Sequence, residues 1–421
     1  MRTLAALIRF QLPIWLTLPL MALTLVAGVG VGLASSRFVF PTTDCTQAEA
    51  VCQEFAKFWQ VWSLAEKSFV DPKALDSEKM TAGAINGMLD SLGDQGHTRY
   101  LSAAETKRWN ESLSGSFEGI GAYINVRDER PIVASPVEGS PAEKAGIKAG
   151  DLILQVDDTD VTGMTSSQVV ALVRGAAGTS VRLTLQHPDE AAPYEVTVVR
   201  AKIEVPSVSW KMLPDKVALV RLTQFARRSG DELQQALKAA RSQGALSIVF
   251  DLRDNPGGLV NEALSVAGEF LPADTTVLLE EDRSGTRSPL KATGGGAARD
   301  IPLIVLVNAN TASSAEIVAG AIQDAKRAQV VGIETIGTGT VLTPYNIQGG
   351  GQLLLGTVQW LTPDGRLIRK EGITPDVKVA LPIGEQGLSP TEAAALPTAD
   401  LPAKDAQLSK ALELLGGAAG K

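Results

Sequence analysis

The chain has 421 residues, of which 44% are hydrophobic and 20% charged, and its formal net charge is −8. This composition excludes a disordered chain, and the length indicates two or three domains rather than one core. The negative charge gives no reason to expect a nucleic-acid partner or an anionic membrane surface. Two histidines and two cysteines that do not cluster predict no metal site, and no cofactor is expected.

The N-terminal region, residues 1–40, contains a long apolar stretch. Residues 12–34 carry no charge over 23 positions, and about 20 apolar residues are enough to cross a bilayer. Arg2 and Arg9 precede the stretch, which predicts a membrane anchor whose N-terminal end stays inside the cell. The alternative is a signal peptide cleaved near Ala34, which would release a secreted protein. Both alternatives place the globular part outside the cytoplasm.

Residues 41–113 are expected to form a helical region. Residues 53–90 read as helical: the segment 55–70 places large apolar side chains three and four residues apart, and a second helix is predicted around residues 80–92. Two cysteines stand at the start of the region, Cys45 and Cys52. They would form a disulfide in an oxidising compartment, or else lie as two free thiols on one helix face, because seven residues make two helical turns.

Residues 114–203 change to a pattern of short strands, with a helix predicted over Ser166–Arg174. The stretch "AGIKAGDLILQVD" makes this segment resemble a PDZ domain. The resemblance implies a groove between that helix and a strand after "GIGA", where an extended C-terminal peptide binds by strand addition. The residues implied in peptide binding are Gly119, Ile120, Gly121 and Ala122. The alternative is a small barrel that only packs on its neighbours.

Residues 204–385 alternate between apolar strands and helices. Continuous apolar strands such as "SIVF" and "PLIVLV" predict an α/β sheet covered on both faces. Residues 386–421 are rich in alanine and proline, and are predicted to be a tail with one helix over Asp405–Leu415 and no role in chemistry.

A series of motifs in a fixed order identifies the family that the chain resembles. They are "LGDQGHTRYL", the PDZ-like insert, "FDLRDNPGGLVNEA", "NANTASSAEIVAGAIQD", "GIETIGTGTV" and "EGITPDV". Together they resemble the carboxyl-terminal processing, or tail-specific, serine proteases over roughly residues 55–379. The resemblance implies a crotonase-like α/β core and a PDZ domain that gates the active site.

Ser313 is the nucleophile that this resemblance implies. A serine between a buried strand and a helix N-terminus lies where unpaired N–H groups and the helix dipole favour negative charge. The N–H groups of Gly258 and Ser314 are the expected oxyanion donors, because adjacent glycines let the backbone approach a substrate carbonyl closely. The alternative is a simple helix cap, since "SSAE", residues 313–316, fits a capping box.

The sequence departs from the family at the general base. Most members carry a lysine 25 positions after the serine, and here that position is Thr338. Lys326 would lie about 20 Å from the serine along the helix, and Asp324 about 16 Å, so neither reaches it, and Asp324 is expected to be structural. Lys370 stays open as an alternative.

His97 is the expected base. It precedes the PDZ-like insert, as does the histidine of the tricorn-like branch of the superfamily, and imidazole is a competent base at neutral pH. The same resemblance implies that Glu371 orients the histidine. The alternative for His97 is a loop residue that bonds to the local backbone, and the other histidine, His187, is expected to be solvated.

The sequence therefore predicts a membrane-tethered serine endopeptidase that binds peptides or proteins with free C-termini and cleaves them through Ser313. The alternative is a catalytically inactive relative that retains peptide binding, favoured by Thr338. A crotonase-type hydratase is disfavoured because the PDZ-like insert would serve no purpose. Substrate identity stays open, as does whether the chain forms a homo-oligomer.

Overall fold

The computed structural model describes residues 47–94, 96–127, 130–188, 190, 192–382 and 385–418. The chain divides into two compact units between residues 80 and 81. In the part of the first unit that is described, α2 (Glu49–Ser68) carries the predicted cluster of aromatic rings. Phe58 contacts Phe55, Trp59 and Trp62 with ring centroids 5.2–6.2 Å apart. The helix α3 (Ser77–Asp90) follows.

The predicted anchor and Cys45 lie outside the described residues. Cys52, within them, is disulfide-bonded. Among the helices described here, none has the length and apolar character needed to span a membrane.

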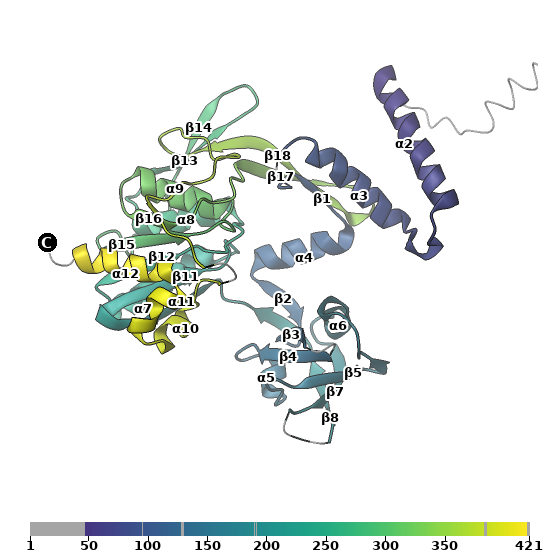
Figure 1. The fold of residues 1–421 in the computed structure, drawn as a ribbon, viewed down its shortest axis with the longest axis horizontal. Coiled ribbons are helices and arrows are strands. Elements are labelled where there is room, and N and C mark those ends of the chain that lie inside the picture. Colours follow the sequence, from purple (N-terminus) through teal and green to yellow (C-terminus); the bar gives the residue numbers. More distant parts are fainter. Residues whose placement is uncertain are drawn as a thin grey trace, which may run out of the picture. The chain divides into compact units, whose positions relative to one another are not determined.

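A PDZ domain occupies the first part of the second unit (Figure 1). Its antiparallel sheet has the order β3-β4-β5-β7-β8, with β6 paired to β5. The elements are β3 (Ala122–Arg127), β4 (Arg130–Pro136), α5 (Pro141–Lys144), β5 (Leu152–Val156), β6 (Thr159–Asp160), α6 (Ser166–Val173), β7 (Ser180–Gln186) and β8 (Tyr194–Val199). The predicted PDZ fold is confirmed. A ribbon of β2 (Ser116–Gly119) and β9 (Ala201–Glu204) pairs the two chain segments that enter and leave it.

The segment Gly119–Ala122 approaches the PDZ helix α5 through its carbonyl groups. The Ile120 carbonyl accepts a hydrogen bond from the Ala142 N–H at 2.8 Å, and the Gly121 carbonyl accepts one from Ser140 Oγ at 2.9 Å. Position 121 requires glycine, because φ is +79° and a Cβ there would lie 2.4 Å from the Ser140 Cβ.

The expectation for His187 was wrong. Its side chain is only 16% exposed, and Nδ1 bonds to the buried carboxylate of Asp151, which also accepts a hydrogen bond from the Tyr194 hydroxyl. The histidine therefore helps to close the PDZ core, because the hairpin folds it back onto that carboxylate.

The α/β core is built on a sheet with the order β10-β11-β12-β15-β16-β19, in which only the edge pair β10–β11 is antiparallel. Its strands are β10 (Val208–Met212), β11 (Val217–Leu222), β12 (Ser247–Asp251), β15 (Leu303–Val307), β16 (Gln329–Gly332) and β19 (Val377–Lys378). Alternate strand residues face opposite sides, so that Val220 and Leu219 enter different apolar clusters. This confirms the predicted α/β class with both faces covered.

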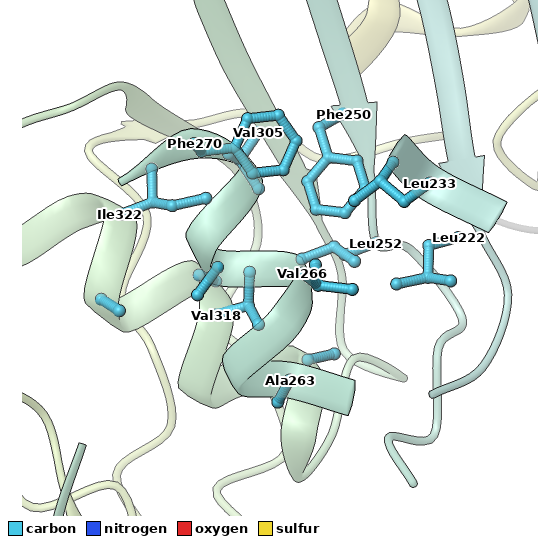
Figure 2. Close-up of a cluster of buried hydrophobic side chains, with 14 of the residues drawn as sticks. Leu222, Leu233, Phe250, Leu252, Ala263, Val266, Phe270, Val305, Val318 and Ile322 are labelled. Carbon is cyan, nitrogen blue, oxygen red and sulfur yellow. The ribbon is translucent and has the colours of Figure 1, made fainter. Parts of the chain in front are cut away.

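Three helices cover one face of this sheet: α7 (Ser229–Ser242), α8 (Val260–Phe270) and α9 (Ser314–Asp324). Figure 2 shows Phe270 of α8 beside Phe250 and Val305 from the strands, and Val318 of α9 belongs to the same apolar cluster. The tight packing fixes the N-terminal ends of α8 and α9, which follow the glycine motif and the candidate serine.

The segment predicted to be a tail covers the other face. Its helices are α10 (Pro390–Ala395), α11 (Leu401–Lys404) and α12 (Ala406–Ala418), drawn in yellow in Figure 1. Leu408 and Leu415 of α12 join the apolar cluster on that face. Arg253, which is fully buried, binds Asp251 at 2.8 Å and Asp405 at 2.9 Å. A buried guanidinium must be paired with carboxylates, and Asp405 of this segment supplies one of the two. The segment is therefore a layer of the core.

A second sheet brings distant parts of the chain together. It has the order β1-β18-β13-β14, and β17 pairs with β18. The strands are β1 (Arg99–Leu101), β13 (Thr276–Glu281), β14 (Arg287–Lys291), β17 (Thr340–Asn346) and β18 (Gln352–Leu361). Arg99 pairs with Leu354, so the loop before β1 is held against the end of the core. The helix α4 (Ala103–Ser114) leads from β1 to the PDZ domain.

Candidate active site

Ser313 stands at the N-cap of α9 in a strained conformation. Its φ is 56° and its ψ −123°, and it is 7% exposed. A non-glycine residue held at positive φ costs about 1–3 kcal/mol and persists only where its surroundings enforce it. The preceding Ala312 is held by a 2.9 Å hydrogen bond from its N–H to the Asn255 carbonyl. Such strain on a serine between a strand and a helix is typical of a nucleophile aimed at substrate.

The glycine motif lies directly against this serine. A Cβ at Gly257 would lie 2.5 Å from the Ser313 Cβ and 2.9 Å from the Ser314 nitrogen, and one at Gly258 would lie 2.3 Å from the Phe225 carbonyl oxygen. Within the described residues, the N–H groups of Gly258 and Ser314 have no hydrogen-bond acceptor. Ser314 Oγ donates to the Gly258 carbonyl at 3.0 Å and ties the two residues together. Both predicted oxyanion donors are thus adjacent to the serine.

Glu316, one turn into α9, holds the surrounding loops. Its fully buried carboxylate accepts hydrogen bonds from the Ser313 N–H at 2.8 Å, the Gly337 N–H at 2.6 Å, the Thr338 N–H at 2.9 Å, and the hydroxyls of Thr335 and Thr338 at 2.5 and 2.8 Å. The predicted capping box is therefore present, and the glutamate also joins the helix to the segment 335–338.

Thr338 fills the position of the family lysine without replacing its function. Its hydroxyl donates to Glu316 and accepts from the Ser313 N–H at 2.6 Å. Because the proton of this hydroxyl is donated to Glu316 and one lone pair accepts from the Ser313 N–H, Thr338 holds the backbone of Ser313 and is not placed to take a proton.

His97 and Ser313 line the same cavity, which has a volume of about 460 Å³. Gly258, Thr338, Thr340 and Trp360 contribute to its walls. The structure thus brings together the predicted nucleophile, the predicted base and one predicted oxyanion donor, although His97 is 216 positions from Ser313 in the sequence.

The His97 ring is held by Thr340, the first residue of β17. Nδ1 lies 2.8 Å from Thr340 Oγ1. Burial lowers the pKa of His97 to about 4, against an upward effect of Asp94 and with a further lowering by Arg99. The imidazole is therefore neutral at physiological pH, the form that a general base requires.

This pKa predicts a pH-dependent stability. Above pH 6.5 His97 is neutral in both the folded and the unfolded protein. As the pH falls from 6.5 to 4 only the unfolded chain gains the proton, because the pKa of His97 is about 4 in the folded state, so the free energy of unfolding decreases and levels off below pH 4. The expected loss attributable to His97 is about 3 kcal/mol.

Denaturation of the wild type and of His97→Gln at pH 7 and pH 4 measures this loss. Between pH 7 and pH 4, the free energy of unfolding should decrease by about 3 kcal/mol less in the variant than in the wild type. Equal decreases in the two proteins would show that burial does not hold His97 neutral.

Glu371 is not brought to His97, which corrects the expected orienting role. Its side chain is exposed, and its main chain packs instead on Gly337, where a Cβ would lie 3.1 Å from the Glu371 nitrogen. Lys326 and Lys370 are also exposed, and neither lines the cavity. Asp324 is structural, as expected: it binds Arg366 and accepts from the Asp364 N–H at 2.9 Å.

The acid near His97 is Asp94. It is 7% exposed and contacts Thr340 Oγ1 at 3.1 Å. The loop "GDQGHT" contains this carboxylate three positions before the histidine, a signal that sequence reasoning missed. Nothing in the sequence indicates Thr340, which lies 243 positions from His97.

Comparison with known proteins agrees with this architecture. Residues 216–379 match the model of peptidase family S41, and residues 132–187 match a PDZ domain. The fold and the site thus define an S41 peptidase core that carries a PDZ insert. Residues 216–379 thus form an S41 peptidase domain, and the chain is similar to carboxyl-terminal processing proteases.

Two relatives with similar sequences are named as carboxy-terminal processing or CtpA-like proteases. The chain is 39% identical over 312 residues to a probable CtpA-like serine protease of Staphylococcus haemolyticus, and 36% identical over 307 residues to the carboxy-terminal processing protease CtpA of Bacillus subtilis. The matches cover 74% and 73% of this chain, but only 62% and 65% of the relatives, so the chain spans less than two thirds of their length. A solved photosystem II D1 C-terminal processing protease is 29% identical, with a TM-score of 0.42, over 76% of this chain and 92% of that one.

Proposed function

We propose that this protein is a serine endopeptidase in which Ser313 attacks the peptide bond and His97 is the general base. The observation that carries the proposal is the shared cavity, in which a strained serine, a neutral imidazole and the glycine motif meet. The arrangement supplies the three functions that acyl transfer needs: a nucleophile, a proton acceptor and donors for an oxyanion.

In the proposed reaction, Ser313 Oγ forms a bond to the scissile carbonyl carbon while its proton passes to His97 Nε2. The N–H groups of Gly258 and Ser314 donate to the carbonyl oxygen as it becomes negative. The imidazolium then protonates the amine as the C–N bond breaks, which leaves an acyl-enzyme. A water molecule, deprotonated by the same histidine, releases the second product and restores the serine.

The PDZ domain is proposed to select substrates with a free C-terminus. The carbonyl groups of Ile120 and Gly121 are directed into bonds with Ala142 and Ser140, which supports a role for the N–H groups of this turn in binding a carboxylate.

The protein is further proposed to act outside the cytoplasm, tethered by residues 12–34 or secreted if that segment is cleaved. The uncharged apolar stretch after Arg2 and Arg9 supports the location. The disulfide at Cys52 supports an oxidising compartment.

A fluorophosphonate probe and paired peptides test the proposal. The folded wild type should become labelled at Ser313, Ser313→Ala should not, and an apolar peptide with a free carboxylate should be cleaved at least about 10-fold faster than its C-terminal amide. No labelling and no hydrolysis by folded protein that still binds the peptide would contradict the endopeptidase function. That result would support the alternative of an inactive peptide-binding relative, which the engaged hydroxyl of Thr338 favours.

A further inference from the structure

A chain of hydrogen bonds connects His97 to a buried carboxylate through a hydroxyl. Nδ1 of His97 lies 2.8 Å from Thr340 Oγ1, and the same oxygen lies 3.1 Å from Asp94 Oδ2 and 3.4 Å from Oδ1. Asp94 is 7% exposed and Thr340 is 7% exposed. The contact is therefore shielded from solvent, where a hydrogen bond to an ionised group is strong.

The chemistry of these groups determines which atom is the donor and which the acceptor in each hydrogen bond. An ionised carboxylate only accepts, so the Thr340 hydroxyl donates its single proton to Asp94. The remaining lone pairs of Thr340 Oγ1 then accept from His97 Nδ1–H. Because a neutral imidazole carries one ring proton, Nε2 is left as an unprotonated acceptor.

The fold holds the carboxylate in place independently of the histidine. Thr98 Oγ1 donates to Asp94 Oδ2 at 2.6 Å, and Arg369 Nε lies 3.2 Å from Oδ1. Thr98 also accepts from the Gly356 N–H of β18 at 2.9 Å. A Cβ at Gly356 would lie 2.9 Å from Asp94 Oδ2, so the absence of a side chain there permits the close approach of the loop to β18.

The pairing of β1 and β17 with β18 places the Thr340 hydroxyl next to the loop that carries Asp94 and His97. Thr340 is the first residue of β17, directly after the segment that Glu316 fixes through Thr338. Strand β1 pairs with β18, and so does β17. The loop that carries Asp94 and His97 and the strand that carries Thr340 are thus attached to one strand.

We propose that Thr340 and Asp94 are positioning residues for the general base: Thr340 relays the charge of Asp94 to His97 Nδ1 and keeps Nε2 free to accept the proton of Ser313. This inference rests on the proposed function. It assigns the orienting role to a threonine–aspartate pair in place of Glu371. The charged groups that face His97 are Asp94 and Arg99, and Arg369 acts on it through Asp94.

Substitution of Thr340 tests the relay. Thr340→Val keeps the shape and removes the hydroxyl, and is expected to lower kcat about 100-fold with little change in KM, as loss of a group that orients a catalytic histidine does. Thr340→Ser restores a hydroxyl and should stay within about threefold of the wild type. Equal activity of the valine variant and the wild type would overturn the proposal, as would an equal loss in the serine variant.

Nitrogen NMR of the imidazoles gives a readout that does not depend on turnover. The sequence contains only His97 and His187, so the spectrum of His97→Gln assigns both. At pH 7 the wild type should show His97 protonated at Nδ1, and Thr340→Val should show a mixture of tautomers. A wild-type ring protonated at Nε2 would overturn the relay even if the enzyme is active. An Nδ1–H ring in a protein that hydrolyses no peptide would support the relay and contradict the proposed function alone.

Discussion

Replacing His97 by alanine is expected to lower kcat/KM for peptide hydrolysis by about 10²- to 10⁴-fold, because this is the usual contribution of a positioned general base and no other base lines the cavity within the described residues. Ser313 would keep its strained geometry, which depends on Glu316 and Asn255 rather than on the histidine. Steady-state kinetics and the rate of fluorophosphonate labelling measure the loss.

Two variants serve as matched controls, Glu371→Gln and Lys370→Met. Both side chains are exposed, and both variants should retain wild-type activity. The wild type should also keep most of its kcat/KM at pH 5.5, because a pKa of about 4 leaves His97 unprotonated there. Full activity of His97→Ala together with loss in Lys370→Met would assign the base to the lysine instead.

Replacing Glu316 by alanine is expected to cost about 4 kcal/mol of stability, since several buried donors lose a charged acceptor at once. The N–H groups of Ser313, Gly337 and Thr338 would be left without this carboxylate. The positive φ of Ser313 would no longer be enforced, so activity should disappear even in the fraction that folds. Chemical denaturation and peptide hydrolysis measure the two effects.

The chain offers a control with the same local motif in an exposed setting. Glu392 completes a capping box with Ser389 at the start of α10. Glu392→Ala should cost only about 1 kcal/mol and leave activity unchanged. Similar losses in the Glu392 and Glu316 variants would mean that Glu316 acts only as a helix cap.

The α/β core and the PDZ domain could be predicted because their signals are local. Apolar strands such as 303–307 and the turns around Gly257 and Gly258 depend on neighbours in the sequence, and the position of Ser313 follows from the motif around it. His97 could be proposed as the base only through a family resemblance, since a lone histidine in a loop carries no pattern of its own.

The environment of His97 could not be predicted. Its contact with Thr340 depends on the pairing of β1 and β17 with β18, across more than 240 residues. Glu371 had the expected residue type at the expected distance along the chain, but its turn directs the main chain toward Gly337 and the side chain toward solvent. Residue type suggested that a carboxylate orients His97, whereas only the tertiary structure shows that Asp94, and not Glu371, lies near it.

The buried ion pairs of Arg253 have a consequence for the extent of the catalytic domain. Arg253 directly precedes the loop of Gly257 and Gly258, and it is neutralised in part by Asp405. The family match ends at residue 379. A protein shortened to that point would expose the apolar face of the sheet that α12 covers, and Arg253, next to the loop of Gly257 and Gly258, would lose Asp405 as a counter-ion. The folded α/β core therefore extends at least to α12, well past the residues that match the family model.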